Sequence, residues 1–514
     1  MKKINQLKAG TILTYINLGL GTVIPLLYTP IMLRILGQSE YGVNSLATSI
    51  TGYLTILNLG MGTAIIRYIT KYRAEGNIKG VESMLGLFLV IYSVLAGLVC
   101  VVGGFLAVFA DSFFGKGLTP SEISILKVLM SLMTINTALS FIVSVFSSVS
   151  ISFERYIFGR TLDIISTILT PILNLCVLFM GLGSIGIAAV GGALQTVYLG
   201  IYILYSWKKL NLKPRFSKLP LYLIKELWGF SMFIFLSSIV DMLYWATDKV
   251  LIGAMVGSVA VAVYNVGGTF TTMLQNMSGA ISNVFVPRVT TMVVTNSEGE
   301  DLSALLTRIG RLQYIIVSLF LSGYIVFGKT FIYYWAGDGY EDAYYIALLT
   351  MIPLAIPLIQ NIAYNIIVAQ NKHQFRAIIY TIIAVVNVVS TYLVLPYYGI
   401  IGAAVCTSIA FLVGNGVIMN IYYYKVTKLD IPGFWRNIGK MSIVPAFMVV
   451  IGYTVVNHSE ISLSLFMAGV IIYVLVFAVL SWLISFNSYE KVLFTDLIKK
   501  TFVFLPIRRK GERL

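Results

Sequence analysis

About fourteen apolar segments, each about twenty residues long, follow one another along this chain. A segment of that length crosses a bilayer as an α-helix, and the absence of apolar-polar alternation excludes an outer-membrane β-barrel. With 58% hydrophobic and 11% charged residues, the composition also excludes a soluble domain. We therefore predict an all-α polytopic membrane protein of about 14 transmembrane helices. The segments begin near Thr11, Val43, Met84, Ile123, Thr161, Ser184, Leu227, Val261, Leu312, Ala343, Ala377, Ile400, Met441 and Ile461.

The charged residues predict the orientation of these helices. Most of the 36 Lys and Arg residues lie in the two tails and in every second loop, whereas Asp111, Glu122 and Asp338 lie in the opposite loops. Cytoplasmic loops of membrane proteins carry an excess of Lys and Arg, so we expect both termini in the cytoplasm. The net charge of +15 then reflects topology and contact with anionic membrane lipids, not a nucleic-acid-binding face.

Short matches recur along the chain at an offset of about 216 residues. Residues 34–37 correspond to 250–253, and residues 183–186 correspond to 399–402. Because the offset covers six segments, an even number, both halves have the same orientation, with a pseudo-two-fold axis along the membrane normal. We therefore predict two six-helix lobes. The domains are an N-terminal lobe at 1–206, a basic inter-lobe linker at 207–226, a C-terminal lobe at 227–424, an extra helix pair at 425–486 and a basic cytoplasmic tail at 487–514.

Polar residues recur at helical spacing within several segments. Those of the second segment should share one helix face, and later segments add Asn276, Asn361 and Asn365. Such faces line a polar cavity or mediate close helix packing, and both interpretations stay open. The second-segment face consists of Asn44, Thr48, Thr51, Thr55, Asn58 and Gly62.

Ionisable residues inside apolar segments are the strongest functional candidates. Each costs about 3 kcal/mol on insertion scales, so they face a protein interior or a water-filled cavity. Arg67 and Arg288 lie near the inner ends of the second and eighth segments. Asp241 and Asp248 share one side of the seventh segment, which indicates a role in coupling to H+ or Na+. The alternatives are structural: Asp241 pairs with Lys249 or with a cation from another helix, such as Arg34, and the long side chain of Arg67 snorkels to the interface.

Several kinds of chemistry lack the residues they need. The chain has two His and three Cys, all dispersed, so neither a metal site nor a Ser-His-Asp hydrolase is expected. It contains no Walker A motif, so we expect no ATP hydrolysis. We therefore predict a protein that is not an enzyme and has no cofactor. Any transport that it performs would draw its energy from an ion gradient or from consumption of the transported molecule.

The N-terminal pattern resembles a known family. Pro30, Arg34, Leu36 and Gly37 close the first segment, and Glu40, Tyr41 and Gly42, then Asn58, Leu59, Gly60, Gly62 and Arg67, follow. This pattern is similar to polysaccharide flippases of the MATE-like multidrug/oligosaccharidyl-lipid/polysaccharide exporter superfamily. The resemblance covers about residues 1–424. It implies a MATE-like fold of two six-helix lobes plus two extra C-terminal helices, working by alternating access in the bacterial cytoplasmic membrane.

The resemblance also implies a cargo, a lipid-linked oligosaccharide attached to undecaprenyl pyrophosphate. We expect Arg67 and Arg288 to bind the pyrophosphate. The expected contacts to the glycan are Asn58, Asn276, Asn361 and Asn365. Membrane lipids, and polysaccharide polymerase or assembly proteins, are the expected partners.

Two other functions stay open. A multidrug exporter of the same superfamily would expel amphipathic cations from an acid-lined cavity, but the first segment has no carboxylate. A membrane scaffold of a glycan synthesis complex would tolerate loss of the intramembrane charges, whereas a transporter would not.

Overall fold

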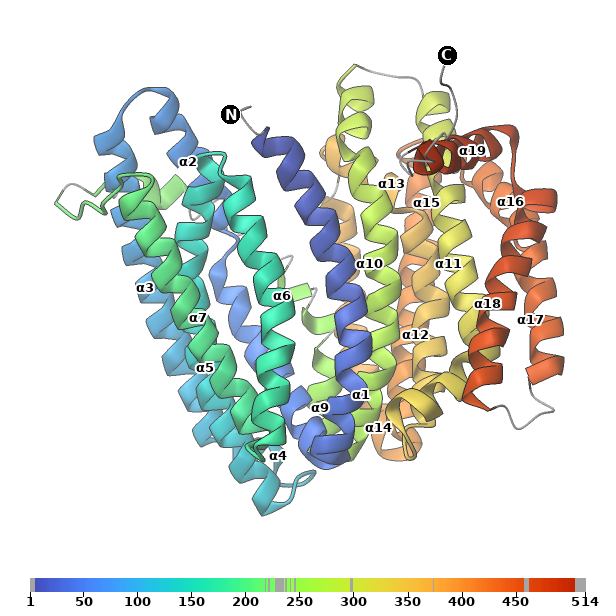
Figure 1. The fold of residues 1–514 in the computed structure, drawn as a ribbon, viewed down its shortest axis with the longest axis horizontal. Coiled ribbons are helices and arrows are strands. Elements are labelled where there is room, and N and C mark those ends of the chain that lie inside the picture. Colours follow the sequence, from blue (N-terminus) through green and yellow to red (C-terminus); the bar gives the residue numbers. More distant parts are fainter. Residues whose placement is uncertain are drawn as a thin grey trace, which may run out of the picture. The chain divides into compact units, whose positions relative to one another are not determined.

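The computed structural model describes residues 5–217, 219–220, 222–226, 235, 238–240, 242–244, 246–295, 299–372, 374–456 and 462–503. Within these ranges all regular secondary structure is helical (Figure 1). The elements are α1 (Gln6–Leu54), η1 (Thr55–Asn58), α2 (Gly62–Ala74), α3 (Ile78–Val108), α4 (Ala110–Phe114), α5 (Pro120–Ser152), α6 (Tyr156–Phe179), α7 (Gly183–Lys208), α9 (Thr247–Met255), α10 (Ser258–Val294), α11 (Gly299–Ala336), α12 (Asp342–Ile359), α13 (Asn361–Ala369), α14 (Gln374–Phe411), η2 (Leu412–Met419), α15 (Asn420–Lys425), α16 (Ile431–Met441), α17 (Ile443–Val456), α18 (Leu463–Leu480), η3 (Ser481–Ser485) and α19 (Ser488–Val503).

The predicted class, an all-α multi-pass membrane protein, is confirmed. Ten helical stretches of the described residues are long and apolar enough to cross a membrane. Two of them, Lys8–Ala74 with 67 residues and Gln374–Lys425 with 52 residues, are more than twice the length that one crossing needs. The count of fourteen stays a prediction, because much of the seventh segment lies outside the described ranges.

Both double-length stretches bend at a glycine. Gly37 has φ 72° and Gly399 has φ 57°, a left-handed backbone conformation that residues with a Cβ rarely adopt. Gly183, at the position that the sequence repeat pairs with Gly399, has φ 55°. The chain therefore turns at corresponding glycines in the two predicted halves, which fits the repeat, while the lobe boundaries stay a prediction.

The second apolar segment is not one continuous helix. The α-helix ends at Leu54, the tighter helix η1 follows, and Leu59 and Gly60 have φ values of 55° and 61°. The prediction that the polar residues from Asn44 to Gly62 share one uninterrupted helix face is therefore wrong beyond Leu54. Regular spacing implies a shared face only while the backbone keeps the α-helical rotation.

The described chain forms two compact units. Unit 1 comprises residues 1–273, 335–350 and 375–410, and unit 2 comprises residues 274–334, 351–374 and 411–514. In unit 1, α3 packs on α5, α5 on α7 and α1 on α6. Tyr92 and Phe141 meet edge to face with their ring centres 6.1 Å apart in its buried core. Within a membrane, close packing of this kind drives helices to associate, because lipid supplies no hydrophobic driving force between them.

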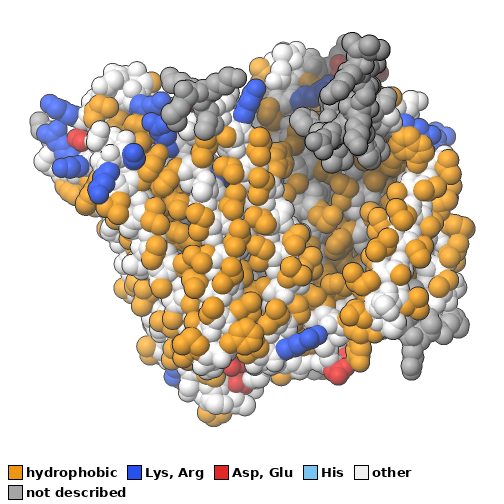
Figure 2. Space-filling model, viewed as in Figure 1, with side chains coloured by type: hydrophobic (Ala, Val, Ile, Leu, Met, Phe, Trp, Pro, Cys, Tyr) orange, Lys and Arg blue, Asp and Glu red, His pale blue; other side chains and the backbone are white. Residues whose placement is uncertain are grey.

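The surface of unit 1 has the pattern expected of a membrane-spanning bundle. Hydrophobic side chains cover its flank, and Lys and Arg gather at the end where α2 meets α3 (Figure 2). The cations there include Lys71, Arg73 and Lys79. The opposite end carries α4, where Asp111 forms an ion pair with Lys127.

Unit 2 holds the C-terminal helices against α11. An apolar cluster that includes Phe327 of α11 and Phe466 and Tyr473 of α18 forms one contact. A buried ion pair forms another: Arg311 of α11 donates to both carboxylate oxygens of Glu490 at 2.6 and 2.8 Å, and also to the carbonyl oxygen of Ser485 at 2.8 Å. Glu490 is 1% exposed. The first turn of α19 is thereby fixed to α11.

Removing one partner of this ion pair should release α19. In Arg311→Gln the buried Glu490 carboxylate loses its counter-charge, which typically costs about 3–5 kcal/mol. We expect hydrogen exchange at residues 488–496 to rise by at least about a hundredfold, because that free energy sets how often the helix opens. The control is the double variant Arg311→Met/Glu490→Leu, which leaves no buried charge and should keep most of the protection. Unchanged exchange in Arg311→Gln would show that the ion pair does not hold α19.

Candidate functional site

Among the ionisable site residues predicted from the sequence and described by the structure, Asp248 is the most buried, and it lies in the first turn of α9. It is 3% exposed. A carboxylate in this position receives partial stabilisation from the positive end of the helix dipole. Isolated burial would still be costly, so the surrounding groups decide whether the charge is tolerated.

Those surrounding groups are hydroxyls from α10 and α14. The hydroxyl of Tyr264 donates to Asp248 Oδ2 at 2.6 Å, and Thr407 Oγ1 donates to the same oxygen at 2.7 Å. Thr391 Oγ1 approaches Asp248 Oδ1 at 3.5 Å. Because α14 bends at Gly399, Thr391 and Thr407 come from its two arms and meet at one carboxylate.

Asn387 completes this group one helical turn before Thr391. Its Nδ2 donates to Thr407 Oγ1 at 3.2 Å, and its side chain is 1% exposed. Its Oδ1 atom is buried and has no hydrogen-bond partner within the described part of the chain. Buried polar atoms are almost always partnered, so this oxygen is an unused acceptor within the cluster. We call Asp248, Tyr264, Asn387, Thr391 and Thr407 the Asp248 cluster.

The chemistry of the Asp248 cluster is that of oxygen alone. One carboxylate, three hydroxyls and an amide oxygen are hard donors, which suit small hard cations and not soft metals. The described residues contain no group of three or more His, Cys, Asp or Glu that would hold a transition metal. The arrangement can therefore take up a proton on Asp248 or coordinate a small monovalent cation.

The neighbouring Lys249 makes a separate contact. Its Nζ donates to Asn265 Oδ1 at 2.6 Å, and Asn265 Nδ2 donates to the Tyr41 hydroxyl at 2.7 Å. Consecutive helical residues point in different directions, so Lys249 and Asp248 serve different networks. The predicted pairing of Lys249 with Asp241 stays a prediction, because Asp241 lies outside the described residues.

A second polar cluster lies at the α4 end of unit 1. Glu122 forms a capping box with Thr119 at the start of α5. It also accepts hydrogen bonds from the Ser39 hydroxyl, at 2.5 Å, and from the Ser258 hydroxyl. Gly42 lies against Ser258 so closely that a Cβ on Gly42 would sit 1.9 Å from the Ser258 carbonyl oxygen. We call Ser39, Gly42, Glu122 and Ser258 the Glu122 closure.

The Glu122 closure joins the two halves of the sequence, because Ser258 comes from the second half. Two further contacts do the same in unit 1. Trp335 Nε1 donates to the carbonyl oxygen of Leu26 at 2.7 Å, and the hydroxyls of Tyr53 and Thr247 lie 2.5 Å apart. These three contacts therefore join helices that were predicted to belong to different lobes.

The other predicted site residues are divided between the two units. In unit 1, Arg67 is exposed on α2, with its guanidinium 5.8 Å from the Tyr68 ring centre. Asn58 accepts a hydrogen bond from the Tyr92 hydroxyl at 2.9 Å. Arg34 is exposed near the Gly37 bend. Residues Arg288, Asn276, Asn361 and Asn365 belong to unit 2, the first two exposed and the last two half-buried. Their predicted convergence on one cavity stays a prediction.

Most of the Asp248 cluster was not predicted from the sequence. The predicted site residues did not include Tyr264, Asn387, Thr391 or Thr407. One signal was available: Asn387 and Thr391 are four residues apart, so a helix places them on one face. Nothing local connects that face to Asp248, which is 143 residues from Thr391.

Comparison with known proteins identifies the family of this chain. Residues 7–293, more than half of the chain, match the family described as "Polysaccharide biosynthesis protein". A Shigella flexneri protein named "Putative O-antigen transporter" is 22% identical over 381 residues, which cover 73% of this chain and 88% of that protein.

Solved structures share the fold. The structure described as "Lipid II flippase MurJ, inward closed conformation" has a TM-score of 0.74 at 16% identity, covering 95% of this chain and 99% of that one. An inward-facing multidrug resistance MATE family transporter of the MOP superfamily has a TM-score of 0.63 at 12% identity, covering 80% and 95% of the two chains. The MATE-like fold expected from the sequence resemblance is therefore confirmed.

Proposed function

Because this chain belongs to the polysaccharide biosynthesis protein family of membrane proteins, we propose that it flips a lipid-linked oligosaccharide between the leaflets of a membrane. The cargo is an oligosaccharide repeat unit carried on undecaprenyl pyrophosphate. It moves from the cytoplasmic to the outer leaflet of the bacterial cytoplasmic membrane, for capsule, O-antigen, exopolysaccharide or teichoic acid synthesis. The chain's cytoplasmic termini and contact with polymerase or assembly proteins are part of this proposal.

The family match is the observation that carries the proposal, and two kinds of relative support the class of cargo. The Shigella flexneri relative is named for O-antigen transport, and MurJ, which shares the fold, is named for flipping lipid II. A lipid-linked oligosaccharide is our proposal for a cargo related to both of these names. A multidrug exporter of the same fold is the alternative, and the lack of a carboxylate in the first apolar segment speaks against it.

Arg67 and Arg288 are the proposed contacts to the pyrophosphate. Both side chains are exposed, so their charges are available to a ligand. A guanidinium forms charge-assisted, bidentate hydrogen bonds with phosphate oxygens, and these are stronger than neutral hydrogen bonds. Asn58, Asn276, Asn361 and Asn365 would add amide groups for the sugar hydroxyls.

The Asp248 cluster supplies the coupling step. We assign to it a Na+ ion, or a proton on Asp248, taken from the outside and released inside as the cargo moves outward. The orphan oxygen of Asn387 and the three hydroxyls favour Na+, because hard oxygen ligands can replace its water shell. An ion bound between α9, α10 and the two arms of α14 would favour the arrangement in which these helices are close together.

The Glu122 closure supports alternating access. Asp111 and Glu122 lie at the end of unit 1 that the charge distribution predicts to be outside, so in the proposed cycle these hydrogen bonds close the outer end. In the proposed cycle these hydrogen bonds break when the cargo is released outside and reform before the next cargo is bound. A membrane scaffold would not require such a rearrangement.

The proposal is tested by the lipid pool of a deletion strain. Mass spectrometry of extracted undecaprenyl-linked glycans should show an assembled oligosaccharide that accumulates without the gene and disappears on complementation. Complementation with Arg67→Ala should give a transport activity about ten- to a hundredfold lower than complementation with the wild type. The reason is that a hydrogen bond to a charged group contributes about 1.5–3 kcal/mol. Arg67→Lys should retain part of the activity because it keeps the charge.

Lys79→Ala is the matched control, because it removes an exposed cation from the same end of unit 1 without touching α2. Its lipid pool should equal that of the wild type. An unchanged lipid pool in the deletion strain, together with increased drug sensitivity, would replace the flippase proposal by drug export. Full complementation by both Arg67→Ala and Arg288→Ala would show that these two residues are not the contacts to the pyrophosphate.

A further inference from the structure

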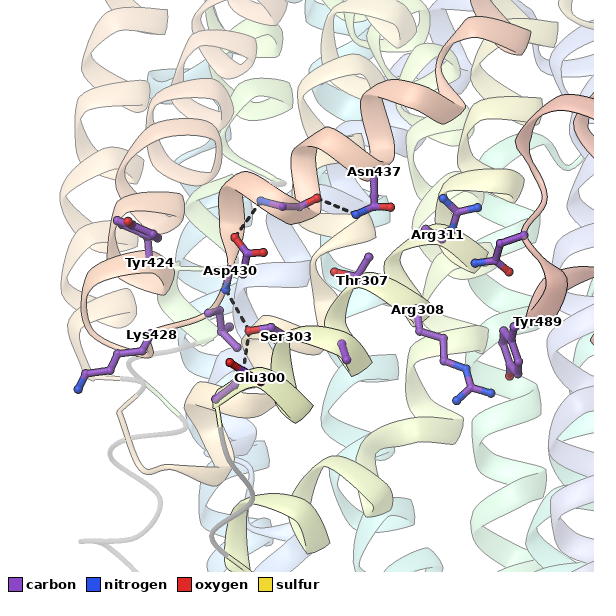
Figure 3. A pocket seen from close by; sticks show the side chains of 15 residues that line it. Glu300, Ser303, Thr307, Arg308, Arg311, Tyr424, Lys428, Asp430, Asn437 and Tyr489 are labelled. Atoms are coloured by element: carbon purple, nitrogen blue, oxygen red, sulfur yellow. Dashed lines mark hydrogen bonds between the residues drawn. The ribbon is translucent and has the colours of Figure 1, made fainter.

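Unit 2 contains a cavity of about 1250 Å³ away from the residues assigned to transport. Its walls are the first part of α11, the stretch from Tyr424 through the start of α16, and the beginning of α19 (Figure 3). The α19 wall consists of Asn487 and Tyr489, which flank the Glu490 carboxylate that pairs with Arg311. All of its lining residues belong to unit 2.

The cavity lies at a membrane surface. Helix α11 has 38 residues and a length of about 57 Å, almost twice the hydrocarbon thickness of a bilayer. Its charged residues Arg308 and Arg311 occur in the first half, so this end projects beyond the apolar layer. Helix α16 has the matching character: Phe434 and Ile438 are buried while Lys440 is exposed. Amphipathic helices of this kind lie in the membrane interface.

Two of the cations at the cavity have no ionic partner. Arg311 is neutralised by Glu490, and Asp430 caps α16 by accepting a hydrogen bond from the Gly433 backbone nitrogen at 2.9 Å. Arg308 and Lys428 form no hydrogen bond or ion pair in the described ranges, and Arg308 Nε is buried without a partner. The two carboxylates of the lining, Asp430 and Glu300, are both exposed and form no ion pair in the described ranges, and Lys428 is exposed as well. Arg308 is half-buried, so it is the unpaired charge that the cavity encloses.

Arg308 is also held in a fixed orientation. Its guanidinium carbon lies 3.3 Å from the centre of the Tyr489 ring, and Figure 3 shows the two groups side by side at the cavity wall. Stacking occupies one face of the guanidinium and leaves its N–H edges available for hydrogen bonds. Lys428 extends outward on the other side of the cavity, so it attracts an anion without stacking against it (Figure 3).

We propose that this cavity binds a phosphate-bearing group at the membrane surface, with Arg308 as its direct contact and Lys428 as an auxiliary charge. A planar guanidinium matches phosphate oxygens in a bidentate geometry, and the buried Nε needs an acceptor. Basic pockets between membrane helices on the cytoplasmic side are suited to anionic headgroups. Because Tyr489 belongs to α19, occupancy of the cavity and docking of the C-terminal helix stabilise each other. This inference does not depend on the cargo of the transporter.

The test is equilibrium binding of a short-chain lipid to the purified full-length protein in detergent. The probe is dioctanoyl phosphatidylglycerol, and dioctanoyl phosphatidylcholine serves as the lipid without net charge. We expect Arg308→Gln to weaken phosphatidylglycerol binding about tenfold or more and Lys428→Gln to weaken it less. Arg308→Lys should recover only part of the affinity, because an ammonium cannot form the bidentate contact.

Lys440→Gln is the matched control, because it removes an exposed cation of α16 that does not line the cavity. Its affinity should be that of the wild type. If Arg308→Gln and Lys440→Gln weaken phosphatidylglycerol binding equally, the affinity depends on overall surface charge and the proposal is overturned. Equal binding of the two lipids by the wild type would overturn it as well.

Competition distinguishes the sources of the phosphate. If glycerol 3-phosphate displaces the lipid at a similar concentration, the cavity recognises a soluble phosphoester. If it displaces the lipid only at a concentration at least about a hundredfold higher, the acyl chains contribute and the ligand is a membrane lipid. Both results retain the assigned contacts, provided that Arg308→Gln weakens the competitor in parallel. As a second readout, the lipid should protect residues 488–496 from hydrogen exchange in the wild type and not in Arg308→Gln.

Discussion

Replacing Asp248 with asparagine should abolish the dependence of transport on an ion gradient. The change preserves size but puts an amide beside hydroxyls that now donate to a carboxylate, at 2.6 Å from Tyr264 and 2.7 Å from Thr407. A neutral amide neither takes up a proton nor balances the charge of a cation. We expect binding of radioactive ²²Na⁺ to the purified protein to fall by at least about a hundredfold, because a charged ligand inside a membrane protein is worth several kcal/mol.

A second variant, Asn387→Ala, tests the same Na⁺ site independently of the Asp248 carboxylate. Asn387→Ala removes the orphan Oδ1 and one hydrogen bond to Thr407 while leaving the carboxylate in place. It should weaken Na⁺ binding about tenfold. If the coupling ion is a proton, Asp248→Asn should instead remove the pH dependence of transport, and Asn387→Ala should leave it nearly unchanged.

Asp163→Asn is the matched control for both variants. Asp163 is a half-exposed carboxylate of α6 that pairs with Arg160 at 3.0 Å, so its loss changes charge in unit 1 without touching α9 or α14. Transport by Asp248→Asn with unchanged dependence on sodium and pH would contradict the assignment of this residue to ion coupling.

Placing a side chain at Gly42 should block closure at the α4 end. Even the Cβ of Gly42→Ala would lie 1.9 Å from the Ser258 carbonyl oxygen, a distance at which backbone atoms must separate. Overpacking costs about 1–3 kcal/mol and sometimes more, which lowers the population of the closed state about five- to a hundredfold. Because each cycle passes through that state, transport should fall by a similar factor, and Gly42→Leu should abolish it.

The closed state can be measured directly by cross-linking. Ser39 and Ser258 both donate to Glu122 Oε1, so cysteines at these two positions should form a disulfide in the closed state. Adding Gly42→Ala to this pair should slow the reaction by the same factor as transport. Gly21→Ala is the control on the same helix, since a Cβ there meets nothing within 4 Å. Rapid cross-linking in the Gly42→Ala background would show that the helices close by another route.

Part of the site was accessible to sequence reasoning. Asp248 was predicted from its place in an apolar segment, because the cost of a buried charge does not depend on knowing the fold. The hydrogen bond of Lys249 to Asn265, at 2.6 Å, was not predicted from the sequence. Residues next to each other in the chain need not share a contact, since consecutive side chains of a helix point in different directions.

The break at Leu59 and Gly60 marks a similar limit. Spacing alone placed Asn58 and Gly62 on the face of a continuous helix, and the structure shows left-handed backbone between them. A leucine at φ 55° is unusual, and only its surroundings in the bundle can hold it there. Asn58 therefore meets Tyr92 of α3 at 2.9 Å, a contact that no periodicity within its own segment implies.

The sequence by itself determined that this protein is a helical, multi-pass membrane protein of the polysaccharide biosynthesis protein family. Segment length, hydropathy and the N-terminal motif are local properties, and the bilayer allows few structures for apolar segments of that length. Only the tertiary structure decided which oxygens surround Asp248 and which residues close around Glu122. Thr407 lies 159 residues from Asp248, and Ser258 lies 136 residues from Glu122. Such contacts depend on how helices pack and where α14 bends, and no pattern within a single segment contains that information.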